Sequence, residues 1–442
     1  MLTKLARIAE VARTRLNEKF TSLGHLIKEE LLEICHNEAK GQKATGVDFG
    51  TKEEYGRNLE ANLKDLVARL KRHGYHPQPV RRVYIPKPGS KAKRPLGIPA
   101  YEDKLVQAAL SKLLNAIYEA DFLDCSYGFR PSRGTHDALK AINYVIERGR
   151  VNYIIDVDIK GFFDHVDHQW LLKFVQHRIA DPNIYRLIYR FLRAGVMEEG
   201  KRYATEEGTP QGGVISPILA NLYLHYVVDL WFEKVVRKSL QGEAYMVRYA
   251  DDLVFCFQYE NEAQNFYQAL GERLAKFNLE IAADKTKIIP FGRFTEEQSQ
   301  KKGKDKPETF DFLGFTHYCG KSRNGKFRVK RKTSKKKFRG SLLKFKEWVK
   351  KSRNMPMHDL WDEASEKLRG YYQYYGLTDN SGMIANYQYE AKRILFKWLN
   401  RRSQRKSFNW SKFGLFLNKY PLPKPRIYVN IFEFRPGIAL PM

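Results

Sequence analysis

The chain has 442 residues, 43% of them hydrophobic, and its 78 Lys and Arg against 50 Asp and Glu give a formal charge of +28. This composition is typical of a folded protein of two or three domains and excludes a disordered tail. The four cysteines form no CxxC pair, which excludes a zinc knuckle and argues against a disulfide framework. The charge favours a nucleic-acid partner, although a basic structural component would carry the same charge.

The N-terminal part of the sequence predicts helices followed by one hairpin. Apolar residues at helical spacing predict helices within 1–40, 52–73 and 102–118, with a break at 41–50. The segment 80–99, VRRVYIPKPGSKAKRPLGIP, alternates and is interrupted by Pro and Gly, which predicts a hairpin with a basic turn. No signal-peptide core and no run of membrane-spanning length occurs, so we expect a cytoplasmic protein without a membrane partner.

Strands that carry acidic residues alternate with long helices in the centre of the chain. VNYIIDVDI (151–159) predicts a buried strand, and AYMVRYADDLVFCFQ (244–258) predicts two strands joined by a polar tip. Helices are predicted over 167–193, 216–238 and 261–277. This alternation predicts an α+β fold in which an antiparallel sheet is backed by helices.

Four carboxylates in the predicted strands are candidates for metal-dependent chemistry. Asp251 and Asp252 form the hairpin tip, and Asp156 and Asp158 share one face of their strand because side chains alternate. If the two segments are neighbours, these acids converge as two-metal phosphoryl transfer requires. The competing interpretations are a plain polar turn and an ion-paired structural cluster.

Seven motifs follow one another within residues 40–320: RRVYIPKPGSKAKRPLGIPAYEDKLVQAAL, CSYGFRPSRGTHDAL, DVDIKGFFDHVDH, GTPQGGVISP, YADD, IAADKTKI and DFLGFTHY. Their order resembles the group II intron reverse transcriptase/maturase family, in its bacterial form that lacks an endonuclease. The resemblance implies a right-hand polymerase, with an N-terminal helical extension over 1–40 and fingers and palm over 41–320. A basic helical thumb or maturase (X) domain with a short C-terminal tail would occupy 321–442.

The same resemblance assigns roles to individual residues. Asp158 and Asp251 would bind two Mg²⁺ ions, for which Mn²⁺ could substitute, with help from Asp252 and the backbone carbonyl of Ile159. Asp156 and Asp164 have weaker claims. Phe163 would exclude the ribose 2′-hydroxyl of a ribonucleotide. The other residues expected to contact the incoming deoxynucleoside triphosphate are Lys87, Arg94, Gln211 and Lys285, the last of which would neutralise or protonate pyrophosphate.

A further set of residues is expected to bind nucleic acid. It comprises Arg130, whose alternative role is to hold the fingers in place, together with Gly212, Gly314, Lys335, Lys336, Lys337 and Arg339. The resemblance implies that the partners are structured intron RNA, an RNA template with a DNA or RNA primer, and target DNA. The chain shows no Cys and His cluster of the kind that an HNH nuclease module needs. The alternatives are a host-adopted relative in defence, repair or spacer acquisition, and a non-enzymatic RNA-binding splicing cofactor.

Overall fold

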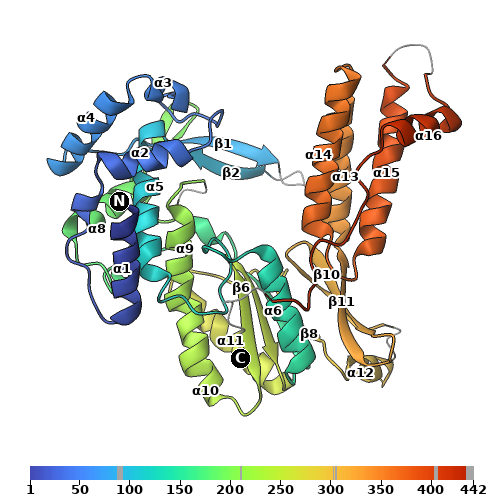
Figure 1. Ribbon diagram of the computed structural model, residues 1–442. Helices are drawn as coiled ribbons and strands as arrows, with labels where there is room; N and C mark the ends of the chain where they lie inside the picture. The colour runs from blue at the N-terminus through green and yellow to red at the C-terminus, as the bar shows by residue number, and fades with distance from the viewer. Residues whose placement is uncertain (87–92, 210–211, 302, 304–305, 403–406, 435–442) are drawn as a thin grey trace.

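The computed structural model describes residues 1–86, 93–209, 212–301, 303, 306–402 and 407–434. Lys87 and Gln211 therefore lie outside the described residues. The chain leads from an N-terminal helical region through a central sheet to a group of C-terminal helices that stand beside it (Figure 1). Sheets backed by helices confirm the predicted α+β class.

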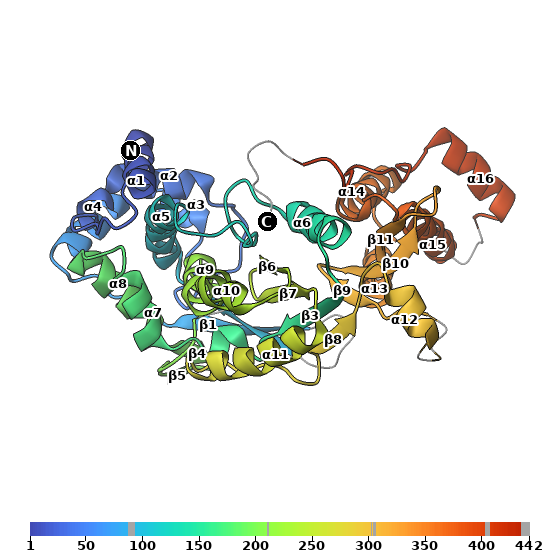
Figure 2. The same cartoon turned by 90° about the horizontal axis from the view of Figure 1, so that it is seen from below.

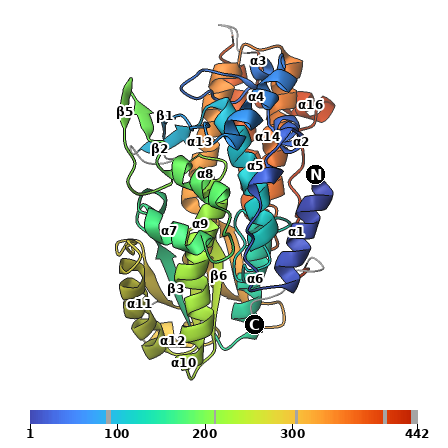
Figure 3. The same cartoon turned by 90° about the vertical axis from the view of Figure 1, so that its left-hand side faces the viewer.

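The N-terminal region confirms the three helical stretches expected from apolar spacing. The first helix packs along the longest one in this region (Figure 3), and the side chains of that longest helix are buried on most sides. The elements are α1 (Leu2–Thr14), η1 (Gly24–Leu26), α2 (Glu29–Glu38), α3 (Lys52–Gly56), α4 (Leu59–Lys71) and α5 (Tyr101–Tyr118).

The predicted hairpin at 80–99 is confirmed, and we call it the fingers hairpin. It consists of β1 (Val80–Pro86) and β2 (Lys93–Ile98), which pair antiparallel with Pro86 opposite Lys93. Two short strands, β4 (Val196–Glu198) and β5 (Lys201–Tyr203), extend this sheet in the order β2-β1-β4-β5. These two strands were not predicted, because three-residue strands carry almost no periodic signal.

The central sheet, which we call the palm sheet, has the strand order β6-β7-β3-β8. Its side chains alternate between two cores. Ile155 and Phe255 belong to the core beneath the sheet, whereas Ile154 and Val254 belong to the core shared with the C-terminal region. Figure 2 shows α11 on one face and α6 on the other. The strands are β3 (Tyr153–Asp158), β6 (Ala244–Tyr249), β7 (Asp252–Phe257) and β8 (Lys287–Pro290).

The helices around the palm sheet confirm most of the predicted pattern. The run predicted as one regular helix over 216–238 is helical, but π-type segments interrupt it, and such segments are frequent at functional sites. Helix α6, which covers the face of the palm sheet opposite α11, was not predicted. The helices are α6 (Thr135–Arg148), η2 (Phe162–Asp164), α7 (His168–Val175), α8 (Pro182–Leu192), α9 (Ser216–Leu224), η3 (His225–Asp229), η4 (Phe232–Val236), α10 (Arg237–Ser239), α11 (Glu260–Ala275) and α12 (Thr295–Lys301).

A second antiparallel sheet, of order β11-β10-β9, joins the palm to the C-terminal helices. Its strands are β9 (Phe310–Phe312), β10 (Phe315–Lys321) and β11 (Phe327–Thr333). The expectation of helix from residue 321 onward is therefore wrong for 321–333, and the boundary placed near 320 falls inside this sheet. The basic residues misled the prediction, because Arg331 faces inward and is buried.

The C-terminal helices, which we call the thumb helices, begin at Lys335. They are α13 (Lys335–Ser352), α14 (Met357–Tyr375), α15 (Ser381–Leu399) and α16 (Trp410–Lys419). The segment that follows α16 returns to the base of this group, where Val429 forms a bridge with Leu377. None of the described helices combines the length and the apolar composition that crossing a membrane requires.

Candidate active site

Three of the candidate acids lie together at one edge of the palm sheet, where β3 and β6 end and β7 begins. Asp158 is the last residue of β3 and stands directly opposite Asp252, the first residue of β7. Asp251 lies in the two-residue loop between β6 and β7, next to Ala250. Asp156 shares the face of Asp158 but lies one pleat deeper in the sheet, opposite Val254. The two acid-bearing segments are thus strand neighbours.

These carboxylates repel one another. Partial burial and the charges of Asp251 and Asp158 raise the pKa of Asp252 to about 6, although its side chain still reaches solvent. Burial also raises the pKa of Asp251, and the positive charge of Arg94 opposes that shift. Burial, followed by repulsion from Asp252 and other acids, raises the pKa of Asp156 to about 7. The cluster therefore holds more negative charge than its surroundings compensate.

Lys285 supplies one compensating charge. Its Nζ lies 3.0 Å from Oδ2 of Asp158 and donates a hydrogen bond to it. This hydrogen bond and the charge of Asp158 raise the pKa of Lys285. Lys287 follows two residues later as the first residue of β8, where its side chain is exposed.

The donor chemistry of the site suits hard divalent ions, because carboxylate oxygens are the ligands that Mg²⁺ prefers. Asp158, Asp251 and Asp252 could supply such oxygens, and a bound cation would relieve their mutual repulsion. In the described part of the chain, however, no three His, Cys, Asp or Glu side chains are arranged closely enough to hold a metal ion. The carboxylate of Asp158 is turned to Lys285 instead.

Phe163 lies in the segment that follows β3, beside a groove of about 330 Å³. The groove is also lined by Pro95 and Gly97 of the fingers hairpin, so Phe163 faces the space between palm and fingers. Its backbone carbonyl accepts a hydrogen bond from the amide of Thr209 at 2.7 Å. Phe162 is buried in the core and does not line this groove.

Ile159 follows Asp158 directly, and its side chain is buried in the core. Only its backbone carbonyl is therefore available for a metal ion. Arg94, on β2 of the fingers hairpin, is exposed, and its charge lowers the pKa values of Asp251 and Asp252. Asp164 ends the short η2 segment and also lines the groove beside Phe163.

The two candidate glycines lie in different surroundings. Gly212 has a φ of +109°, which favours glycine. A Cβ at this position would come within 2.7 Å of the carbonyl oxygen of Gly97, so Gly212 packs closely against the fingers hairpin. Gly314 forms, with Leu313, the two-residue turn between β9 and β10, and both have positive φ. A Cβ on Gly314 would lie 3.3 Å from the hydroxyl of Tyr375, so the thumb helices pack against this turn.

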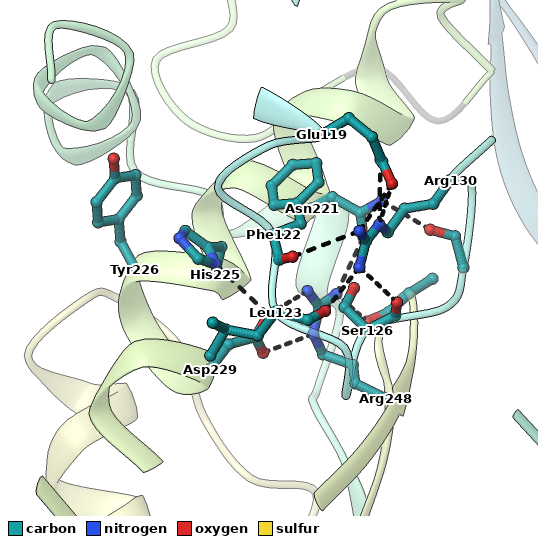
Figure 4. A network of polar contacts seen from close by, with 12 residues as sticks. Glu119, Phe122, Leu123, Ser126, Arg130, Asn221, His225, Tyr226, Asp229 and Arg248 are labelled. Carbon is teal, nitrogen blue, oxygen red and sulfur yellow. Dashed lines mark hydrogen bonds and ion pairs between the residues drawn. The ribbon is translucent and has the colours of Figure 1, made fainter. Parts of the chain in front are cut away.

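Arg130 requires a correction, because the structure buries it (Figure 4). Its guanidinium forms an ion pair with Glu119 at 2.7 Å and donates to the carbonyls of Leu123 at 2.6 Å and Ser126 at 2.8 Å. It also stacks over the ring of Phe122. A side chain that is 3% exposed and fully engaged inside the protein does not reach a nucleic acid, so the expected contact is wrong.

Two family models match the chain. Residues 85–317 match the model described as reverse transcriptase (RNA-dependent DNA polymerase), and residues 336–414 match the group II intron, maturase-specific domain. The chain belongs to the reverse transcriptase family. Both matches confirm the resemblance seen in the motif order. The first model covers the last two residues of β1, all of β2, the palm sheet and all three acids at the strand ends.

Individual relatives agree with this assignment. The chain is 41% identical over 225 residues to the group II intron-encoded protein LtrA of Lactococcus lactis subsp. cremoris, which is 50% of this chain and 37% of LtrA. It is 34% identical over 326 residues to the protein YkfC of Escherichia coli (strain K12), or 66% of this chain and 80% of YkfC. The matched region therefore spans well under half of LtrA but most of YkfC.

The basic residues expected to bind nucleic acid lie at the start of α13. Lys335, Lys336, Lys337 and Arg339 are all exposed, and no acidic residue lies in that first turn. The charge of Lys337 lowers the pKa of Asp252, so this end of α13 is directed toward the acids. Their contact with nucleic acid stays a prediction.

Two further polar residues around the candidate site were missed by the sequence analysis. Arg248 is fully buried two residues before Ala250 and binds Asp229 and Asn221. Gln107 on α5 accepts a hydrogen bond at 2.8 Å from the amide of Val214, which follows Gly212 and Gly213. An arginine inside the apolar strand AYMVRY was the available signal for Arg248, because a buried charge needs a partner.

Proposed function

We propose that the chain is an RNA-directed DNA polymerase that also binds structured group II intron RNA and assists its splicing and mobility. The observation that carries the proposal is the direct opposition of Asp158 and Asp252 across the β3–β7 pair, with Asp251 in the adjoining turn. Its substrates would be an RNA template with a DNA or RNA primer, deoxynucleoside triphosphates and, during mobility, target DNA.

In this proposal, Asp158 and Asp251 are the main ligands of Mg²⁺, or of Mn²⁺ in its place, and Asp252 assists. When bound, two such ions promote attack by the primer 3′-hydroxyl and stabilise the leaving pyrophosphate. Lys285 holds a proton near the leaving group, since its raised pKa keeps the ammonium charged. Phe163 borders the groove between palm and fingers, where a bulky ring would clash with a ribose 2′-hydroxyl.

Support for the RNA-binding role comes from the C-terminal part of the chain. Residues 336–414, which include most of the thumb helices, match the maturase-specific domain model. The formal charge of +28 and the exposed basic turn that begins at Lys335 provide the phosphate neutralisation that RNA binding needs.

Primer extension on an RNA template tests the polymerase role. Purified wild-type protein should extend a DNA primer when Mg²⁺ is present, and Asp251→Asn should abolish extension because it removes a ligand charge. The same variant should bind the RNA with nearly unchanged affinity, which shows that the protein is folded. Asp284→Asn, an acid in the turn before β8, is the matched control and should extend normally. Full extension by Asp251→Asn would refute the site assignment.

The RNA-binding role is tested by sequencing the RNA that copurifies with the protein from its host. We expect strong enrichment of one structured intron. A broad pool of transcripts would instead favour a host-adopted enzyme, and intron enrichment together with an inactive wild-type polymerase would favour a non-enzymatic splicing cofactor.

A further inference from the structure

The turn that carries Asp251 has an unfavourable backbone. Ala250 has a φ of +56°, a region that residues with a Cβ rarely adopt, whereas Asp251 has no positive φ. A two-residue loop with positive φ only at its first position has the pattern of a type II′ turn, in which that position favours glycine. Because Ala250 occupies this position, contacts from the surrounding protein must hold the turn.

Arg248 makes the contact that reaches this turn, and Figure 4 shows its guanidinium beside Asp229 and Asn221. Its Nη1 donates to the carbonyl oxygen of Ala250 at 3.0 Å and to Oδ1 of Asn221 at 3.0 Å. Its Nε and Nη2 donate to the two carboxylate oxygens of Asp229 at 2.7 and 2.5 Å. Arg248 and Asp229 are both fully buried, so this fork is fixed in one orientation.

The same residues fasten a second segment against the turn. The amide of Arg248 donates to the carbonyl of Cys125 at 2.7 Å, and its own carbonyl accepts from the amide of Tyr127 at 2.8 Å. Gly128 then lies so close to Ala250 that a Cβ on it would be 2.4 Å from the Ala250 nitrogen. The side chain of Asn221 donates to the carbonyl of Gly128 at 2.7 Å, which closes the ring of contacts.

Asp229 comes from η3, one of the π-type segments in the helix that supports the palm sheet. A π-type turn shifts the following side chains around the helix axis relative to a regular α-helix. Here the carboxylate of Asp229 faces the guanidinium of Arg248 under the sheet edge (Figure 4). The irregular helix and the unfavourable turn are thus connected through one side chain.

We propose that Arg248, held by Asp229 and Asn221, is a positioning residue that fixes the Ala250 carbonyl and thereby the direction of the following carboxylates. The inference deepens the proposed function, on which it rests, by assigning the support of the acidic turn to a residue that touches neither substrate nor metal. Arg248 acts through backbone geometry, so its removal should disturb the reaction and the binding of divalent ions while the protein stays folded.

The test compares Arg248→Lys with Arg178→Lys in the full-length protein. Lysine keeps the charge but cannot donate to Asp229 and the Ala250 carbonyl at the same time. Arg178 is a matched control, because it is almost as buried, pairs with Asp121 and donates to the backbone carbonyls of Ala12 and Glu18, and none of its hydrogen bonds among the described residues reaches the turn. Both variants should lose similar thermal stability.

Only Arg248→Lys should lower kcat for primer extension, by about 100-fold, as small displacements of catalytic groups do. It should also weaken Mn²⁺ binding, measured by electron paramagnetic resonance with primer–template present, by about tenfold or more. The Mn²⁺ signal that belongs to the site is the part lost in Asp251→Asn. A wild-type protein that fails to extend would refute the proposed function, and Mn²⁺ binding would still decide the role of Arg248.

Ala250→Gly gives a second, independent measurement. Glycine adopts the required φ without support, so the turn should depend less on Arg248. A double-mutant cycle compares the effect of Arg248→Lys in the wild-type and Ala250→Gly backgrounds. The fold-loss of kcat and of Mn²⁺ affinity should be smaller in the Ala250→Gly background, by a factor of about ten or more. The inference would be overturned if Arg248→Lys lowered kcat and Mn²⁺ affinity equally in both backgrounds. It would also be overturned if these reductions were no larger than those caused by Arg178→Lys.

Discussion

Replacing Arg130 by Met distinguishes a buried structural arginine from one that binds nucleic acid. The guanidinium is 3% exposed and donates to the backbone carbonyls of Leu123, Ser126 and, at 3.4 Å, Phe122, as well as to Glu119. Methionine fills much of the space of the arginine stem but offers no donor. We therefore expect Arg130→Met to destabilise the fold and to leave the electrostatic component of RNA binding unchanged.

The size of the effect follows from these contacts. Hydrogen bonds from a charged donor contribute about 1.5–3 kcal/mol each, and the carbonyls of Leu123 and Ser126 lose theirs. The Glu119 side chain is 33% exposed and can be rehydrated, so its lost pairing adds little. The free energy of unfolding should fall by about 3 kcal/mol, which lowers Tm by roughly 3–5 °C in a chain of this size.

The assay measures Tm together with the salt dependence of RNA binding. Each phosphate contact contributes about 0.7–0.9 to the slope of log Kobs against log salt concentration. Arg130→Met should keep the wild-type slope, whereas the control Lys336→Met, from the exposed first turn of α13, should reduce the slope by that amount and leave Tm unchanged. An unchanged Tm with a shallower slope in Arg130→Met would refute the reasoning.

Three further predictions concern the site and the network beneath it. Phe163→Ala should raise ribonucleotide incorporation by at least about tenfold relative to deoxynucleotides, and competition assays that detect no change would remove its role in sugar selection. Lys285→Met should slow single-turnover extension by about 10²–10⁴-fold, whereas the exposed Lys287→Met should extend at the wild-type rate, and equal rates would contradict the assignment. Burial lowers the pKa of His225 to about 4, so the fold should lose up to about 3 kcal/mol as pH falls from 6.5 to 4, because the unfolded chain binds the proton first. Urea denaturation across that range should show a smaller loss for His225→Gln, and identical pH profiles would refute this prediction.

The sequence predicted those elements whose signal is local. The fingers hairpin, the β6–β7 hairpin and the long helices each carry their own periodicity, and the acids at 158, 251 and 252 are visible because charges are rare in apolar strands. The opposition of Asp158 and Asp252 needed strand pairing, which the residues alone left open. The motif order supplied the missing register, since it resembled a family in which the two segments are neighbours.

Burial of basic residues was the main source of error. Arg130 was expected to contact nucleic acid and residues 321–333 were assigned to a basic helical domain, yet Arg130 and Arg331 are both inside the protein and 327–333 form β11. The partners of Arg248 lie 19 and 27 residues earlier in the chain, so no local pattern indicated them. Whether an arginine binds a phosphate or a buried carboxylate depends on packing between distant segments, which single-sequence periodicity does not report.

The acids lie between two basic elements that come from distant parts of the chain. Arg94 of the fingers hairpin and Lys337 of α13 both lower the pKa of Asp252, and Arg94 also acts on Asp251. Because these interactions weaken with distance, both cations must lie near the carboxylates. A polyanion that contacts both elements must therefore pass over the end of β3 and β7. In the proposed function this one arrangement would set both nucleic-acid affinity and catalytic position, so α13 variants should alter primer placement as well as binding strength.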